Sequence, residues 1–231
     1  MVKVVVVGSV ALDSIRTPFG RAERVLGGSA TFASYASSFF ADTGIVGVVG
    51  KDFPKEHVKL LEKKGIDTGG LSVAEGKTFF WEGFYDYDLI KAHTVKTELN
   101  VFEKFSPVLP ESFRKADFLF LGNISPKLQL NVLRQMKKRP KLVVSDTMNF
   151  YIAREPENVL DVVKEVDIAL MNDSEARELF KTPNLLQAAK KILALNSEYA
   201  IIKKGEHGSI MFTKKAHFAA PGYPLEQVID P

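Results

Sequence analysis

The sequence predicts an α/β protein with a doubly wound, mostly parallel sheet that carries helices on both faces. The first observation is a series of short apolar runs, several of them β-branched, as in strands buried on both faces of a parallel sheet. They cover residues 2–7, 45–49, 118–121, 142–144, 168–171 and 200–202. The second observation is that helical patterns separate these runs. Strand alternating with helix is typical of doubly wound domains.

The predicted helices cover residues 26–40, 55–64, 127–138, 157–164, 173–180 and 185–195. In the first of them, bulky side chains recur from Phe32 to Phe40 with helical spacing, while the opposite face carries only small residues. A helix without a charged face is usually buried on both sides. We expect this helix to start at Gly27-Gly28-Ser29, with Ser29 as its N-cap. The glycines would let a ligand approach free backbone N–H groups, although a plain glycine turn explains them equally well.

Composition narrows the class of protein. The 231 residues are enough for one domain, and 45% hydrophobic with 26% charged residues is typical of a soluble globular chain. The 31 Lys and Arg against 28 Asp and Glu are scattered, so no nucleic-acid partner is expected. The absence of cysteine excludes disulfides and thiolate metal sites. The N-terminal apolar run is too short to span a bilayer and lacks a signal-cleavage pattern, so we expect a cytoplasmic protein without a membrane partner.

Two segments interrupt the alternation, at about residues 12–25 and 77–102. The first reads as a short extended excursion, and the second is rich in strand formers whose halves, residues 78–85 and 93–101, are expected to pair around a polar turn at 86–88. Phe79, Trp81 and neighbouring aromatic residues exceed what a small sheet can bury alone. Such a sheet would cover a cleft, contact a partner chain, or both. An edge hairpin packed on the main core is the alternative.

Polar residues follow the predicted strands, where ligands bind in open parallel sheets. They are Asp13, Asn123, Asp146, Asn149, Asn172 and Glu175. Each also has a purely structural explanation: an Asp after a strand is often a turn residue, and Asn172 with Glu175 has the capping-box spacing. Their convergence on one edge of the sheet favours a binding site.

Residues 201–211 read as strand, glycine turn, strand. Lys203, Lys204, Gly205 and Gly208 could lie against a planar or phosphorylated ligand, and a plain hairpin is the alternative. His207 is expected to be a solvated turn residue. The four histidines have no metal-ligand spacing, and neither the Walker A pattern nor the G-x-G-x-x-G fingerprint is present.

In order along the chain, these motifs resemble the ribokinase-like (PfkB) carbohydrate kinases. The matching residues are Gly8-Ser9 with Asp13, Gly27-Gly28, the VGVVGKD segment at 46–52, Asn172-x-x-Glu175, Lys204-Gly205-x-x-Gly208 and VIDP at 228–231. The resemblance covers essentially the whole chain. It implies transfer of the γ-phosphoryl group of ATP, with Mg²⁺, to a hydroxyl group of a sugar or nucleoside.

The resemblance also implies roles for the candidate residues. Asp13, Gly27 and Gly28 would hold the substrate, with Asn123 on the same side. Lys203, Lys204, Gly205, Gly208 and Asn172 would border the nucleotide, together with Asp146 and Asn149, while Glu175 would serve Mg²⁺ through water. The segments at 12–25 and 77–102 would form the family's lid, which often also makes a homodimer contact.

Two departures from the family pattern affect these expectations. Phe32 stands where the family often has an Asn that contacts the substrate. The family continues after Asp230 into a Thr-Gly-Ala-Gly-Asp loop, which supplies the anion hole and the catalytic Asp, whereas this sequence ends at Pro231. We therefore expect no catalytic base within it and no activity from it alone. A nucleoside kinase, a non-catalytic sugar-binding or interaction protein, and another Rossmann-like enzyme such as a dehydrogenase or methyltransferase remain alternatives.

Overall fold

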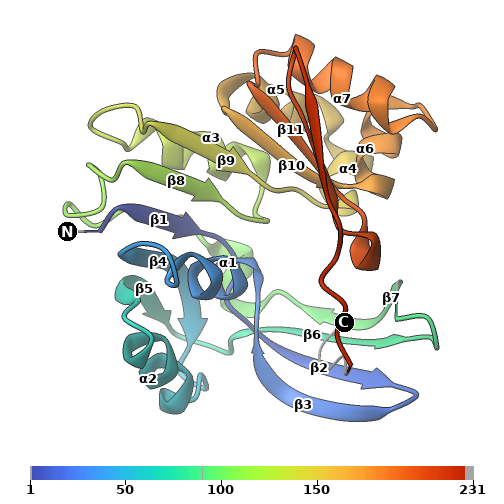
Figure 1. Cartoon of the computed structure of the whole chain (residues 1–231). Coiled ribbons are helices and arrows are strands. Elements are labelled where there is room, and N and C mark those ends of the chain that lie inside the picture. The colour runs from blue at the N-terminus through green and yellow to red at the C-terminus, as the bar shows by residue number, and fades with distance from the viewer. Residues whose placement is uncertain (1, 90, 227–231) are drawn as a thin grey trace.

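The larger of two sheets forms the centre of the molecule (Figure 1). The computed structural model describes residues 2–89 and 91–226. The larger sheet has nine strands in the order β13-β12-β11-β10-β9-β8-β1-β4-β5. They are β1 (Val4–Val7), β4 (Thr43–Gly50), β5 (Asp67–Ala74), β8 (Phe118–Leu121), β9 (Leu142–Ser145), β10 (Ile168–Asn172), β11 (Tyr199–Lys203), β12 (Ser209–Phe212) and β13 (His217–Ala220). The seven neighbouring strands β11, β10, β9, β8, β1, β4 and β5 are parallel. Strands β12 and β13 are antiparallel additions at one edge.

Helices cover both faces of this sheet, which confirms the predicted fold class (Figure 1). The helices are α1 (Ser29–Ser37), α2 (Lys55–Lys63), α3 (Pro126–Arg134), α4 (Asn149–Arg154), α5 (Pro156–Glu165), α6 (Asp173–Phe180) and α7 (Leu185–Ala194). Side chains of one strand alternate between the two cores: Val6 packs with α1 and α2, and Val5 and Val7 pack with the helices of the other face. Because β1 serves both cores, every residue in it is apolar.

A second sheet of four strands extends from one end of the larger sheet (Figure 1). Its order is β3-β2-β6-β7, with β2 (Ala11–Thr17), β3 (Gly20–Gly27), β6 (Phe79–Tyr85) and β7 (Ala92–Glu98). The predicted antiparallel pairing of β6 with β7 is confirmed. The segment expected to be a simple excursion is instead the β2–β3 hairpin, which joins β6 through a parallel pairing of β2. The two irregular segments therefore build one sheet.

Helix α1 corrects one expectation. Its small residues Ala30 and Ser34 face the sheet and are fully buried, whereas Phe32 is 54% exposed and Phe40, in the turn after the helix, is 90% exposed. The prediction that this helix is buried on both sides is therefore wrong. Small side chains allow the helix to lie close to β1 and β4, and the aromatic stripe then points outward. On that stripe the Lys64 ammonium lies 3.5 Å from the centre of the Phe39 ring.

Some elements were not predicted from the sequence. Strand β5 carries the pair Gly69-Gly70 and several polar residues, and it lies at the edge of the sheet, so it lacks the continuous apolar run of a central strand. Strand β13 is the opposite edge, and α4 is a short helix of six residues. Within the part of the chain that the structure describes, no helix combines the length and apolar character needed to cross a bilayer.

Candidate functional site

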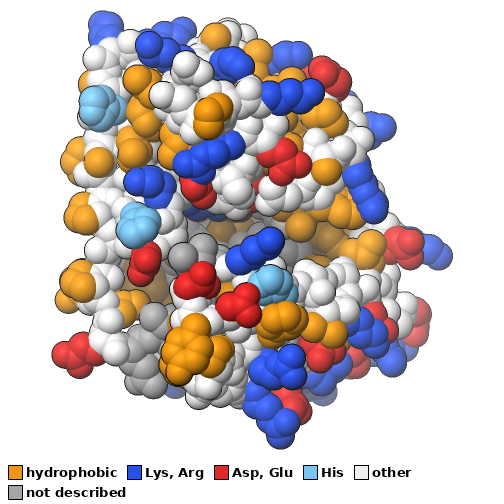
Figure 2. Space-filling view, turned by 90° about the vertical axis from the view of Figure 1, so that its right-hand side faces the viewer, with side chains coloured by type: hydrophobic (Ala, Val, Ile, Leu, Met, Phe, Trp, Pro, Cys, Tyr) orange, Lys and Arg blue, Asp and Glu red, His pale blue; other side chains and the backbone are white. Residues whose placement is uncertain are grey.

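The predicted polar residues gather where the parallel strands end. Asn123 follows β8, Asp146 follows β9, Asn172 ends β10 and Lys203 ends β11, and these four strands are consecutive neighbours in the sheet. Since they are parallel, their carboxyl ends meet at one edge. Figure 2 looks at the side of the molecule on which this edge lies, and shows the surface hollowed between the larger sheet and the four-stranded sheet, with charged side chains of both signs around it.

Asp13 enters this region from the four-stranded sheet. It lies on β2, paired with Val25 of β3 and Trp81 of β6. Its carboxylate packs directly on Gly27, because a β-carbon at residue 27 would overlap Oδ2 of Asp13. Gly28 is required for a different reason: its φ is +98°, and a β-carbon there would overlap the carbonyl of Ser9. The glycine pair therefore makes room for a carboxylate and for a close backbone crossing.

The hydroxyl of Ser29 is not an N-cap, contrary to the sequence prediction. The cap position is Gly28, and no side chain caps the helix there. Instead, Ser29 Oγ accepts hydrogen bonds from the backbone N–H groups of Ser9 at 3.2 Å and of Asn123 at 3.1 Å. Ser9 Oγ in turn accepts from the Ser29 N–H at 3.0 Å, and the Ser9 carbonyl accepts from the Ala30 N–H at 2.9 Å. The first N–H groups of α1 are thus bound to Ser9, and they are not the free donors that the glycine pair suggested.

The position of the Ser29 hydroxyl also explains why two further residues are glycines. A β-carbon at Gly8 would lie 2.6 Å from Ser29 Oγ, and one at Gly122 would lie 2.9 Å from it. Both distances are too short for a side chain. The ends of β1 and β8 therefore reach the start of α1 only because each carries a glycine. Sequence reasoning noted Gly8 as part of a motif but did not identify Gly122.

Asn123 presents an unpaired acceptor. Its Nδ2 lies 3.0 Å from the sulfur of Met148, and its Oδ1 is buried without a hydrogen-bond partner among the described residues. A buried carbonyl without a donor lowers the stability of the folded state. Such a group is suited to accept a hydrogen bond from a ligand hydroxyl or amino group.

Asp146 and Lys203 form an ion pair with 3.0 Å between Oδ1 and Nζ. Sequence reasoning missed the residue that holds Asp146 in place, which is Gln129 on α3. Gln129 is 2% exposed, and its Nε2 donates to the carbonyls of Leu121 at 3.2 Å, Gly122 at 2.9 Å and Asp146 at 2.9 Å. It therefore connects the ends of β8 and β9. A glutamine in the apolar stripe of an amphipathic helix was the available signal.

Asn172 and Glu175 form the capping box that their spacing predicted. The Glu175 N–H donates to Asn172 Oδ1 at 2.8 Å, and the Asn172 N–H donates to Glu175 Oε2 at 2.7 Å. Burial raises the pKa of Glu175 to about 7, against the opposing effects of the Asn172 hydrogen bond and the Lys203 charge. This carboxyl group thus combines capping with an acidity near neutral pH.

A Mg²⁺ site built from protein ligands alone is not apparent. In residues 2–89 and 91–226 there is no group of three His, Asp or Glu side chains placed to hold a metal ion. Mg²⁺ usually keeps several waters and is held by one or two carboxylates together with substrate phosphates. The buried Glu175, close to the charges of Lys203 and Asp146, fits such an indirect arrangement.

Asn149 is placed differently from its neighbours in this group. It begins α4, and its Nδ2 donates to Glu178 Oε2 on α6 at 2.5 Å. The side-chain amide therefore connects two helices on one face of the sheet. The structure links Asn149 to α6 rather than to the Asp146–Lys203 ion pair.

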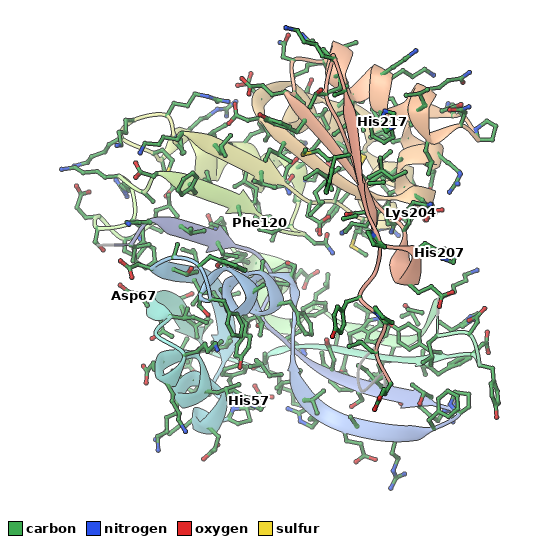
Figure 3. The ribbon with its side chains drawn as sticks, viewed as in Figure 1. His57, Asp67, Phe120, Lys204, His207 and His217 are labelled. Atoms are coloured by element: carbon green, nitrogen blue, oxygen red, sulfur yellow. The ribbon has the colours of Figure 1, made fainter. Side chains whose placement is uncertain are left out.

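The segment after β11 is the predicted strand, glycine turn, strand. The Lys204 N–H donates to the Gly208 carbonyl at 2.7 Å, and one 3₁₀ turn (Gly205–His207) separates the strands. Gly205 and Gly208 have φ angles of 57° and 81°, so both require a residue tolerant of the left-handed region. Figure 3 shows Lys204 and His207 at the end of the hairpin nearest the four-stranded sheet, with His217 further away. The His207 side chain is 69% exposed, as expected of a solvated turn residue.

Two further features lie outside this group of residues. The motif at 228–231 falls outside the described residues. A surface pocket of about 420 Å³ lies between α7 and the β12–β13 turn, and none of the predicted site residues lines it. The candidate site is therefore the open edge between the two sheets.

Comparisons with known proteins identify the family of the chain. A family model described as pfkB family carbohydrate kinase matches residues 1–231. A cytidine kinase of Thermococcus kodakarensis is 27% identical over 235 residues, which cover 100% of this chain and 84% of that protein.

Solved structures share the fold at low sequence identity. The nucleoside kinase of Burkholderia thailandensis in complex with inosine has a TM-score of 0.78 and 16% identity, over 99% of this chain and 78% of that one. A putative ribokinase II of E. coli in complex with ATP and Mg²⁺ has a TM-score of 0.79 and 18% identity, over 99% of this chain and 80% of that one. A probable sugar kinase of Rhizobium etli CFN 42 has a TM-score of 0.81 and 17% identity, over 100% of this chain and 82% of that one.

Proposed function

The chain belongs to the PfkB family of carbohydrate kinases, and on this premise we propose that it takes part in transfer of the γ-phosphoryl group of ATP to a hydroxyl group of a nucleoside. The observation that carries the proposal is the meeting of two sets of residues at one edge of the sheet. Asp13 with Gly27 supplies a carboxylate for hydroxyl groups, and Asp146 with Lys203 supplies a charged pair at the ends of β9 and β11.

The nucleoside is preferred as substrate because the cytidine kinase of T. kodakarensis matches the chain along its entire length. A free sugar is the second candidate. Asp13 would accept hydrogen bonds from vicinal hydroxyl groups, and both a sugar and the ribose of a nucleoside have them. The buried Asn123 Oδ1 offers one further acceptor on the same side.

On the nucleotide side we assign Lys203, Lys204, Gly205 and Gly208 to the phosphates and the adjoining nucleoside of ATP, with Asn172 and Asp146 nearby. Asn149, whose side chain is hydrogen-bonded to Glu178, is an outlying member of this group. Glu175 would hold the hydration shell of Mg²⁺, which when bound neutralises charge on the phosphates. Phosphoryl transfer asks the protein mainly to position the reactants and to provide donors for developing charge. Lys203 and Lys204 are suited to the second task.

The residue that accepts the hydroxyl proton is assigned by family resemblance to the segment after Asp230, outside the described residues. We give no described carboxylate that role, and Asp13 serves to orient the hydroxyl. The four-stranded sheet acts as a lid, which excludes water from the phosphoryl group. Binding is therefore the most direct measurement of the proposal.

The test is isothermal titration of cytidine, inosine and ribose, with and without a non-hydrolysable Mg·ATP analogue. We expect a nucleoside to bind, and Asp13→Ala to weaken its binding by about 10- to 100-fold, as expected for a hydrogen bond to a charged group. The affinity for the nucleotide analogue should stay the same. The proposal would be refuted if none of the three ligands binds. It would also be refuted if Asp13→Ala leaves the Kd for the nucleoside unchanged. ADP formation, measured separately, distinguishes a kinase from a binding protein.

A further inference from the structure

We infer that Arg24 is a positioning residue for the substrate side of the site, because its ion pair with Asp52 fixes strand β3 relative to the larger sheet. Arg24 Nη2 lies 2.9 Å from Asp52 Oδ2. Arg24 belongs to β3, whereas Asp52 follows β4. The inference rests on the proposed function for the identity of the ligand, but not for the contact itself.

Asp52 is a fixed partner for this arginine. Its second oxygen, Oδ1, accepts hydrogen bonds from the Thr78 N–H at 2.7 Å and from the Thr78 hydroxyl at 2.8 Å. The Thr78 hydroxyl in turn accepts from the Gly50 N–H at 3.0 Å. Asp52 therefore joins the end of β4, the residue before β6 and, through Arg24, the strand β3.

Other ion pairs of the four-stranded sheet do not contact the larger sheet. Arg21–Glu23, Lys96–Glu98 and His93–Asp86 each join two residues of that sheet or of its turn. The Arg24–Asp52 pair instead connects the two sheets. An exposed ion pair contributes little when both side chains are mobile. Here the carboxylate is already held by two hydrogen bonds from Thr78, so less conformational freedom is lost when the arginine binds.

The backbone of Arg24 is a second, independent observation. Its φ is +50°, in the left-handed region that a non-glycine residue adopts only when surrounding contacts hold it there. The Arg24 N–H donates to Ser14 Oγ at 3.1 Å, and the β2–β3 register shifts at this point, between Asp13 and Ile15. The irregularity is thus bound on one side by Ser14 and on the other by Asp52.

The consequence falls on the next residues of the strand. Immediately after Arg24, Val25 pairs with Asp13, and Gly27 packs against the Asp13 carboxylate. A displacement of Arg24 would therefore move Asp13 and Gly27, which are proposed to hold the substrate hydroxyls. Residues Asp146, Asn172 and Lys203 belong to the larger sheet or follow its strands, and they would not move with β3.

The test compares Arg24→Gly with Arg21→Gly in the same strand. Glycine accepts a positive φ, so Arg24→Gly removes the ion pair without adding backbone strain. The control removes an exposed pair that stays within the sheet. Three measurements are made on each variant: the Kd for cytidine, the Kd for a non-hydrolysable Mg·ATP analogue, and amide hydrogen exchange of residues 11–13 and 25–27.

We expect Arg24→Gly to raise the cytidine Kd by about fivefold, the upper range for a solvent-accessible ion pair, with the nucleotide Kd unchanged. Amide exchange should accelerate in residues 11–13 and 25–27 but not in β7. Asp52→Asn should have the same effects, and the double variant should be no worse than either single one. Equal exchange in Arg24→Gly and Arg21→Gly would overturn the inference, as would cytidine and nucleotide affinities that fall together. If the unaltered protein binds no nucleoside or sugar, the proposed function fails, while hydrogen exchange still decides the role of Arg24.

Discussion

The carboxylate of Asp13 occupies the space that a side chain at Gly27 would need. The two residues are diagonal neighbours across the β2–β3 hairpin, in which Asp13 pairs with Val25 and Gly27 pairs with Ala11. Asp13 can keep its carboxylate in this position only because residue 27 has no side chain. This relationship predicts that the smallest possible enlargement of Gly27 acts on the function of Asp13.

Gly27→Ala should displace the Asp13 carboxylate and weaken nucleoside binding by about tenfold or more, in line with the loss of a charged hydrogen bond. Nucleotide binding should not change, since Lys203 and Lys204 lie on the larger sheet and its hairpin. Gly20→Ala is the matched control, because no heavy atom lies within 4 Å of a β-carbon at the other end of the same strand. Titration calorimetry measures both affinities. Equal nucleoside affinities in the two variants would contradict the assignment of Asp13.

Glu175→Gln separates helix capping from metal binding. Glutamine also completes a capping box, so capping alone predicts no loss of stability. At pH 8, above the raised pKa of about 7, the wild-type carboxylate is charged while buried, and its neutral replacement should keep or raise the melting temperature. If Glu175 holds the water shell of Mg²⁺, the variant should lose Mg²⁺-dependent nucleotide affinity. A nucleotide Kd that responds to Mg²⁺ equally in both proteins would defeat the metal assignment.

Asp52 predicts a dependence of stability on acid pH. Burial would raise the pKa of Asp52, but hydrogen bonds from Thr78 and the charge of Arg24 outweigh burial and hold the pKa below its usual value. A carboxyl group whose pKa is depressed on folding contributes stability above its unfolded pKa and loses it as the pH falls through the folded value. Between pH 6 and pH 3, the free energy of unfolding should therefore fall more in the wild type than in Asp52→Asn, as measured by urea denaturation. Parallel pH profiles of the two proteins would show that Asp52 contributes nothing.

Gln129→Met should lower the free energy of unfolding by about 1–3 kcal/mol, because three buried carbonyls lose their common donor. Gln129→Glu should be worse at pH 8 than at pH 5, since a charged carboxylate would then face the same carbonyl oxygens. Urea denaturation measures both effects. A stability of Gln129→Glu that does not vary with pH would mean that the side chain has turned away from the carbonyls.

The four-stranded sheet is expected to form a dimer contact. Phe19 is 65% exposed, Tyr87 is 78% exposed, and their rings make an edge contact with centroids 5.2 Å apart. An exposed apolar group of this kind often marks an interface. Light scattering should show a dimer at about 100 µM, a concentration at which even a micromolar interface is mostly occupied. Phe19→Ser should shift the protein toward monomer, and a monomeric wild type at that concentration would rule the contact out.

The sequence predicted the elements whose environment is symmetrical. Strands such as β1 and β4 contribute side chains to the cores on both faces, so their apolar runs alone identify them. Strand β5 was missed because an edge strand with Gly69-Gly70 has no such run. Asn123, Asp146, Asn172 and Lys203 lie at or just after the ends of β8 to β11, and their meeting at one edge follows from the parallel order of these strands.

Orientation and tertiary contacts were less accessible. The period of α1 was recognisable, but a periodic pattern does not say which face meets the sheet, and the small face did so. Ser29 had the local signature of an N-cap, yet its hydroxyl is used by Ser9 and by Asn123, 94 positions away. Gln129 had no signal beyond its place in an apolar stripe. Such contacts depend on distant chain segments that local patterns do not reveal.

The contacts of Ser29 also constrain when the fold can be completed during synthesis. Strand β1 pairs with β4 on one side and with β8 on the other, so the middle of the sheet closes only after residues 118–121 have joined residues 4–7. A chain growing on the ribosome has made Ser9 and Ser29 long before Asn123 exists to donate to the same hydroxyl. The substrate side of the edge is thus completed late, across a loop of more than a hundred residues. Long-range closure of this kind slows folding, because entropy is lost before the contacts form. We expect arrested nascent chains shorter than about 120 residues to remain protease-sensitive in the β1 region.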